Sequence, residues 1–179
     1  MAWGYATPFT PFAAGTVPRE LFKGRSQIVD HLLDPSQSGV IYGGRQLGKS
    51  AILRAVEREV ERRRKELGVQ AYVCYLDIRA LGSRDVSLSR RPDALWGMLR
   101  NWLHSTRLLQ SPPDDPVALR TRLVERFKRD KSLQIYLLLD EADNFLEADG
   151  AADFPILTEL KALSDETGRR VRGNQGHSV

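Results

Sequence analysis

Apolar and polar positions follow two different patterns along this chain. In residues 49–67 apolar side chains recur every three or four positions, which predicts an amphipathic helix. Ala71–Ile78 and Leu133–Leu139 are instead nearly continuous apolar runs, which are typical of strands buried in a parallel sheet. Strands that alternate with helices indicate the α/β class. We therefore expect a parallel sheet with helices packed against it.

The chain begins with a segment that is poor in regular structure. Residues 1–20 are expected to form an extended lead-in, because their three prolines fix φ and disfavour helix in the preceding residues. A short helix is predicted over about Arg25–Leu33. Gly39–Tyr42 is a brief apolar run followed by two glycines, which favours a buried strand that leads into a tight loop.

Three further amphipathic helices are predicted in the second half of the chain. They run from Leu95 to Leu109, from Pro116 to Phe127 and from Phe154 to Thr167. Asp115 and Asp153 are placed to cap the last two of these helices, since a short acidic side chain accepts hydrogen bonds from the first turn. Gly168 is expected to end the final helix.

Composition narrows the class of protein. The chain has 179 residues, of which 41% are apolar, enough for the core of one domain. There are 27 basic and 23 acidic residues, and three of the basic ones lie at positions 169, 170 and 172, so the rest is nearly neutral and a nucleic-acid partner is not expected. Cys74 is the single cysteine, which excludes an internal disulfide and favours a core position. No run approaches the ~18 apolar residues of a membrane span, so we expect a cytoplasmic protein with no membrane association.

A phosphate-binding loop is the clearest motif in the sequence. It matches G-x-x-x-x-G-K-[ST] in full and lies between a predicted strand and a predicted helix, as the motif requires. Its residues are Gly43, Gly44, Arg45, Gln46, Leu47, Gly48, Lys49 and Ser50. The backbone N–H groups of such a loop point at phosphate oxygens, and the helix adds its positive end. We expect Lys49 to reach the β- and γ-phosphates and the Ser50 hydroxyl to bind Mg²⁺.

Two acidic residues end the third predicted strand. Asp140 and Glu141 follow the apolar run and lie at the carboxyl edge of the sheet, where ligands bind in open α/β folds. Asp140 suits the oxygen shell of Mg²⁺, and Glu141 is placed to polarise the water that attacks a γ-phosphate. Four more acids follow, and we expect a solvated loop there rather than additional metal ligands. These are Asp143, Glu147, Asp149 and Asp153.

The two motifs together resemble the ATPase domain of AAA-type and STAND-type P-loop proteins, in particular bacterial and archaeal ATP-binding proteins with a G-x-R-x-x-G-K-S loop. Phe22, Gly24 and Arg25 resemble the hydrophobic-Gly-Arg element that precedes the loop in that group. The resemblance implies that these three residues line the adenine end of the pocket. A helix-entry turn with a packed Phe22 is the alternative. The implied cofactors are ATP and Mg²⁺, and the implied chemistry is attack of water on the γ-phosphate.

The same resemblance implies a three-layer α/β/α fold with a parallel sheet of strand order 5-1-4-3-2. We expect residues 21–168 to form part of that domain, because the segment 169–179 is a basic polar tail without the apolar run of a fourth strand. The fourth and fifth strands, the arginine finger and the helical lid are not located. A truncated or frameshifted chain, a fragment completed by another chain, and a rearranged sheet are the three explanations, of which we favour the first. It predicts nucleotide binding with poor turnover.

Three other functions are possible for a chain with these motifs. A nucleotide-sensing switch would bind ATP without hydrolysis, and a DNA-acting helper ATPase would need a basic surface. Asp140–Asp143 also spells the DEAD motif of RNA helicases, but the chain lacks their Ser-Ala-Thr motif and second domain. A protein partner or a homo-oligomer is expected for the complete form of the domain.

Overall fold

The computed structural model describes residues 26–34, 39–41, 48–79, 81 and 93–172. The chain divides into two compact units, Met1–Glu59 and Val60–Val179, which are described separately below. The expected lead-in, residues 1–20, lies outside the described residues, as do residues 173–179 of the expected tail.

The first unit contains helix α1 (Ser26–Leu32) and the beginning of helix α2 (Lys49–Leu67). Both helices were predicted, and α2 has the bounds that its apolar period indicated. Val29 of α1 is buried, and so is Leu33, which follows the helix. The predicted secondary structure is therefore confirmed for both helices.

The strand predicted over Gly39–Tyr42 is not formed in its described part. Gly39, Val40 and Ile41 have no strand conformation, and the Val40 side chain is 60% exposed. An apolar run of this length becomes a buried strand only when a neighbouring strand completes its hydrogen bonds. In the expected order its neighbours are the fourth and fifth strands, and no part of the described chain supplies either.

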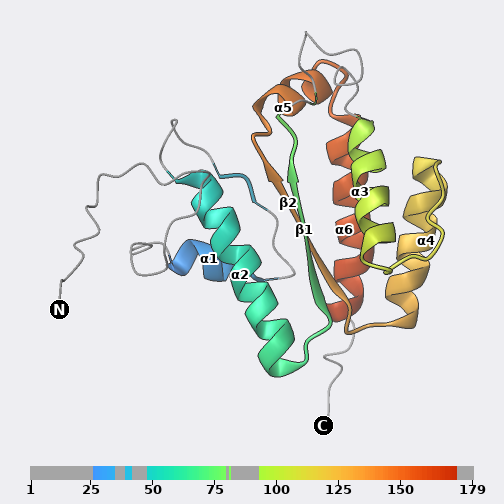
Figure 1. Cartoon of the computed structure of the whole chain (residues 1–179). Helices are drawn as coiled ribbons and strands as arrows, with labels where there is room; N and C mark the ends of the chain where they lie inside the picture. Colours follow the sequence, from blue (N-terminus) through green and yellow to red (C-terminus); the bar gives the residue numbers. More distant parts are fainter. Residues whose placement is uncertain (1–25, 35–38, 42–47, 80, 82–92, 173–179) are drawn as a thin grey trace. The chain divides into compact units, whose positions relative to one another are not determined.

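The second unit is built on two parallel strands, β1 (Ala71–Asp77) and β2 (Gln134–Asp140), which Figure 1 shows side by side. The register runs from Ala71 beside Gln134 to Asp77 beside Asp140. These are the second and third predicted strands, and their parallel pairing confirms the α/β class. Among the described residues of β2 only Leu138 is buried.

Four helices accompany these strands in the second unit. They are α3 (Ala94–Ser105), α4 (Pro116–Arg129), α5 (Asp143–Gly150) and α6 (Pro155–Arg172). The predicted cap of α4 is confirmed, because an Asp115 carboxylate oxygen accepts from the Ala118 N–H at 2.8 Å. Helix α3 ends at Ser105 and does not reach Leu109 as predicted. Within the described ranges no helix combines the length and the apolar character needed to cross a bilayer.

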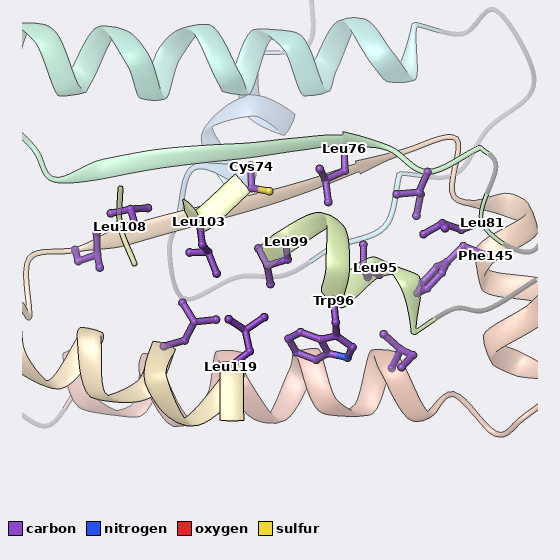
Figure 2. Packing of buried hydrophobic residues seen from close by; sticks show 14 residues of the cluster. Cys74, Leu76, Leu81, Leu95, Trp96, Leu99, Leu103, Leu108, Leu119 and Phe145 are labelled. Carbon is purple, nitrogen blue, oxygen red and sulfur yellow. The ribbon is translucent and has the colours of Figure 1, made fainter. Parts of the chain in front are cut away.

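The core of the second unit lies between one face of the strands and the helices, as Figure 2 shows. Helix α3 supplies Leu95, Trp96, Leu99 and Leu103 to it, and β1 supplies Cys74 and Leu76. The Trp96 indole N–H also donates to a carboxylate oxygen of Glu159 on α6 at 3.1 Å. Cys74 is fully buried, and desolvation raises the pKa of its thiol to about 12, which confirms the predicted core position.

The beginning and end of α6 differ from the prediction. Asp153 does not cap the helix, because Asp153 and Phe154 both have positive φ, 67° and 55°. Asp149 caps it instead, and the helix then continues past Gly168 to Arg172. A single glycine costs a helix about 1 kcal/mol, which neighbouring turns can offset, so Gly168 does not end it. The segment expected as a tail is therefore helical over residues 169–172.

Candidate functional site

The described end of the phosphate loop is the junction of Gly48 with helix α2. Gly48 has a φ of 76°, a left-handed conformation that costs a residue with a side chain about 1 kcal/mol or more. The Ile52 N–H donates to the Gly48 carbonyl at 3.1 Å, which closes the first turn. Lys49 and Ser50 are thus the first two residues of the helix, as the motif requires, and both are half-buried.

The electrostatics of this junction favour an anion. The first turn of α2 contains no acidic residue. The partial positive charge of the helix N-terminus therefore adds to that of the Lys49 ammonium. Gly43, Gly44, Arg45, Gln46 and Leu47 lie outside the described residues, as do Phe22, Gly24 and Arg25 of the expected adenine element.

The carboxyl ends of β1 and β2 form an acidic edge in the second unit. The register places Asp77 directly beside Asp140, and the Ile78 N–H donates to the Asp140 carbonyl at 3.0 Å. Glu141 follows, so three carboxylates leave the sheet at one edge. Asp140 and Glu141 were predicted there. Asp77 was not predicted, because it lies within the predicted strand Ala71–Ile78 and its pairing with Asp140 depends on the register of the two strands.

The Asp140 carboxylate is held by hydrogen bonds to both of its oxygens. The Tyr75 hydroxyl donates to Oδ2, and the Glu141 N–H donates to Oδ1 at 3.0 Å. Tyr75 was not predicted as a site residue. In the sequence it is one of several apolar or aromatic residues of a strand, and only the register of the two strands shows that its hydroxyl reaches Asp140. The two bonds restrict rotation of the Asp140 carboxylate.

Glu141 is in a strained and exposed position. Its φ is 56°, which residues other than glycine and asparagine rarely adopt, and its side chain is 47% exposed. A guanidinium nitrogen of Arg79 lies 3.7 Å from its carboxylate and 3.5 Å from that of Asp77. Because all three side chains are exposed, these ion pairs are screened by water.

The backbone around Arg79 is fixed at two points. Its N–H donates to an Asp77 carboxylate oxygen at 3.1 Å, and its carbonyl accepts from the Asn144 side chain at 3.3 Å. Asn144 belongs to α5, so this contact ties the segment after β1 to the segment after β2. Neither Arg79 nor Asn144 was predicted as a site residue.

The acids that follow Glu141 do not lie in the expected loop, although Asp143, Glu147 and Asp153 are solvent-exposed as expected. They belong mainly to helix α5, which runs from Asp143 to Gly150. Asp149 is fully buried, and its two carboxylate oxygens accept from the N–H groups of Ile156 and Leu157, each at 3.0 Å. Its role is to cap α6, because a buried carboxylate needs such donors. The described residues contain no group of three or more His, Cys, Asp or Glu side chains that could hold a metal by themselves.

Individual side chains nevertheless suit Mg²⁺ of the kind found with nucleotides. Mg²⁺ prefers oxygen ligands and keeps several waters, so phosphate-bound Mg²⁺ needs only one or two protein ligands. The Ser50 hydroxyl and the Asp140 carboxylate are such ligands by chemical type. No protein-family model, curated protein or solved structure matches this chain.

Proposed function

We propose that this chain is an ATP- and Mg²⁺-binding domain of the P-loop type. Lys49 contacts the β- and γ-phosphates, Ser50 and Asp140 hold the metal ion, and Glu141 orients the attacking water. Bound Mg²⁺ supplies positive charge that stabilises the phosphate oxygens during transfer. The observation that carries the proposal is the complete phosphate-loop sequence. Its last glycine, Gly48, has a left-handed conformation, and Lys49 and Ser50 follow it in the first turn of α2.

The acidic edge supports the same proposal. Asp140 and Glu141 end a strand at the carboxyl edge of a parallel sheet, which is where open α/β folds bind their ligands. The direct pairing of β1 with β2 also agrees with the order 5-1-4-3-2, in which the second and third strands are neighbours. That order belongs to the AAA-type and STAND-type ATPases that the motifs resemble.

Binding of ATP without turnover is the second candidate function. It is favoured by the placement of Arg79, because its guanidinium lies 3.7 Å from the Glu141 carboxylate and competes with a water molecule for the carboxylate oxygens. Both candidates require ATP binding, and they differ only in phosphate release. Measurement of ATP affinity and of phosphate release on the same sample separates them.

The direct test is the affinity of the purified chain for ATP with Mg²⁺, measured by isothermal titration calorimetry. We expect Lys49→Ala to weaken binding about tenfold to a hundredfold, because a hydrogen bond to a charged group contributes about 1.5–3 kcal/mol. Lys65→Ala is the matched control. Lys65 lies on the same helix, its side chain is 78% exposed, and it pairs with Glu61. A wild-type chain that binds no ATP, or a Lys49→Ala chain that binds it as tightly as wild type, would contradict the proposal.

Steady phosphate release by the wild-type chain that is lost in Glu141→Gln would establish the hydrolytic function. ATP binding that leaves phosphate release at the level of a protein-free control would establish the switch instead. Substitution with Gln removes the charge of Glu141 and keeps its size, so it tests the water-orienting role without changing the fold.

A further inference from the structure

The face of the sheet on which Tyr75 lies is set by the strand register. Successive side chains of a strand point to opposite faces, and Cys74 and Leu76 belong to the core cluster. Tyr75 therefore projects from the face of β1 that points away from this cluster. Leu138 lies beside Tyr75, so Asp140, two residues further along β2, is on the same face and diagonal to the tyrosine.

This placement allows the Tyr75 hydroxyl to reach the Asp140 carboxylate. The hydroxyl donates to Oδ2 across the two strands, between residues 65 positions apart in sequence. The other oxygen, Oδ1, accepts the Glu141 N–H at 3.0 Å. Donors on both oxygens restrict rotation of the carboxylate about the Cβ–Cγ bond more than a donor on one oxygen alone would.

The Tyr75 side chain suits this task better than a smaller donor. Its ring is half-buried, and only two side-chain torsions place the hydroxyl, so few conformations compete with the observed one. A tyrosine at such a position satisfies its O–H with a polar partner. Here the partner is the carboxylate that the proposed function assigns to Mg²⁺.

We infer that Tyr75 is a positioning residue that orients Asp140 toward the metal ion of a bound nucleotide. The inference rests on the proposed function, because it concerns the same Mg²⁺. Donors that orient a metal-binding carboxylate determine how well it binds, and their loss weakens metal affinity about tenfold to a hundredfold. Tyr75 acts through Asp140 and does not itself touch the nucleotide.

The test is the Mg²⁺ concentration that half-saturates binding of a fluorescent ATP analogue to the full chain. We expect Tyr75→Phe to raise this concentration about tenfold and to leave binding in EDTA unchanged, since only the metal-dependent part involves Asp140. Tyr72→Phe is the matched control. Tyr72 lies on the same strand, its hydroxyl bonds to Gln70 at 3.4 Å, and its ring keeps the contact with Arg64 after the change.

A double-mutant cycle distinguishes positioning from a general effect on the fold. In an Asp140→Asn background we expect Tyr75→Phe to change the Mg²⁺ requirement by less than twofold. The hydrogen bond from the Tyr75 hydroxyl then no longer acts on a metal-binding carboxylate, because the substituted side chain is an amide. An unchanged Mg²⁺ requirement in Tyr75→Phe would overturn the inference alone, provided that the wild-type chain binds the analogue. An equal loss of binding in EDTA, or full additivity with Asp140→Asn, would assign Tyr75 a structural role and also overturn it. A wild-type chain that binds no analogue would overturn both the inference and the proposed function.

Discussion

At the residue scale, three aspartates of the second unit show how partners decide the role of one side-chain type. Asp149 is fully buried and caps a helix, Asp140 is fixed at a strand end, and Asp130 lies in a turn after α4. Each has hydrogen-bond donors that match its surroundings, since a carboxylate withdrawn from water must replace its lost hydration. Of the three, only Asp140 has a position that serves the proposed chemistry.

Asp130 provides a prediction about pH. Its carboxylate accepts from the Ser132 hydroxyl at 2.7 Å, and this bond is the main reason why its pKa lies below the ordinary value of 3.8. A lowered pKa in the folded state stabilises the protein above the unfolded pKa, and that stabilisation is lost as pH falls through the folded pKa. We therefore expect Ser132→Ala to lower the free energy of unfolding at pH 7 and to match wild type well below pH 3.8, as measured by urea unfolding.

Ser105→Ala is the control for this prediction. The Ser105 hydroxyl donates to the Trp102 carbonyl at 2.8 Å, and no carboxylate is involved. Any loss of stability in this variant should be the same at every pH. A Ser132→Ala deficit that persists unchanged well below pH 3.8, where Asp130 is protonated in both the folded and the unfolded state, would show that the hydroxyl acts on something other than the ionised Asp130.

At the element scale, the start of helix α6 depends on Asp149, which lies seven positions before Ile156, a buried residue in the first turn of the helix. Asp149 lies in the last turn of α5, and its carboxylate accepts from two N–H groups in the first turn of α6. The helix is also fixed by Glu159, which accepts from Trp96, and by Glu166, which lies 3.7 Å from Arg120 of α4. These contacts join α6 to α3 and α4 around the shared core.

We expect Asp149→Ala to lower the free energy of unfolding by about 2–4 kcal/mol. The change leaves two N–H groups without their acceptor, each at a cost of about 1–3 kcal/mol when shielded from water. Asp115→Ala removes an exposed cap and should cost only about 1 kcal/mol. Urea unfolding of both variants tests the difference. Equal losses would contradict the role of Asp149, and Asp149→Asn, which keeps one oxygen acceptor, provides an intermediate case if the alanine variant does not fold.

At the scale of the whole molecule, the two motifs of the proposed site belong to different compact units. Gly48, Lys49 and Ser50 lie in Met1–Glu59, and Asp140 and Glu141 lie in Val60–Val179. If one nucleotide engages both motifs, its binding must affect both units, because a ligand stabilises every segment whose folded form it requires.

Hydrogen exchange provides the corresponding prediction. At a concentration of ATP and Mg²⁺ about 100 times the Kd, binding stabilises the folded state by about 2.7 kcal/mol. We expect slower amide exchange both in the first turn of α2 and at residues 140–144, and no slowing at either place in Lys49→Ala. Protection confined to α2 would mean that the acidic edge does not take part in binding the nucleotide.

The sequence by itself determined the elements whose signals are local. The apolar period gave the bounds of α2, and the apolar runs gave β1 and β2 within one residue, because burial of one face or of a whole strand imposes those patterns. The N-cap of α4 was equally local, since Asp115 bonds to a residue three positions away. The phosphate-loop motif and the Asp140-Glu141 pair were visible for the same reason.

Tertiary structure alone decided the features that join distant segments. Only the register of β1 with β2 places Asp77 beside Asp140 and brings the Tyr75 hydroxyl to the Asp140 carboxylate. The run Gly39–Tyr42 looked like a strand, yet its described residues form none, since a strand needs a neighbour that a local pattern cannot supply. Asp149 looked like a solvated acid until its hydrogen bonds from two backbone N–H groups were known. Hydrogen bonds between distant residues depend on which surfaces meet, and no local pattern of side chains specifies that.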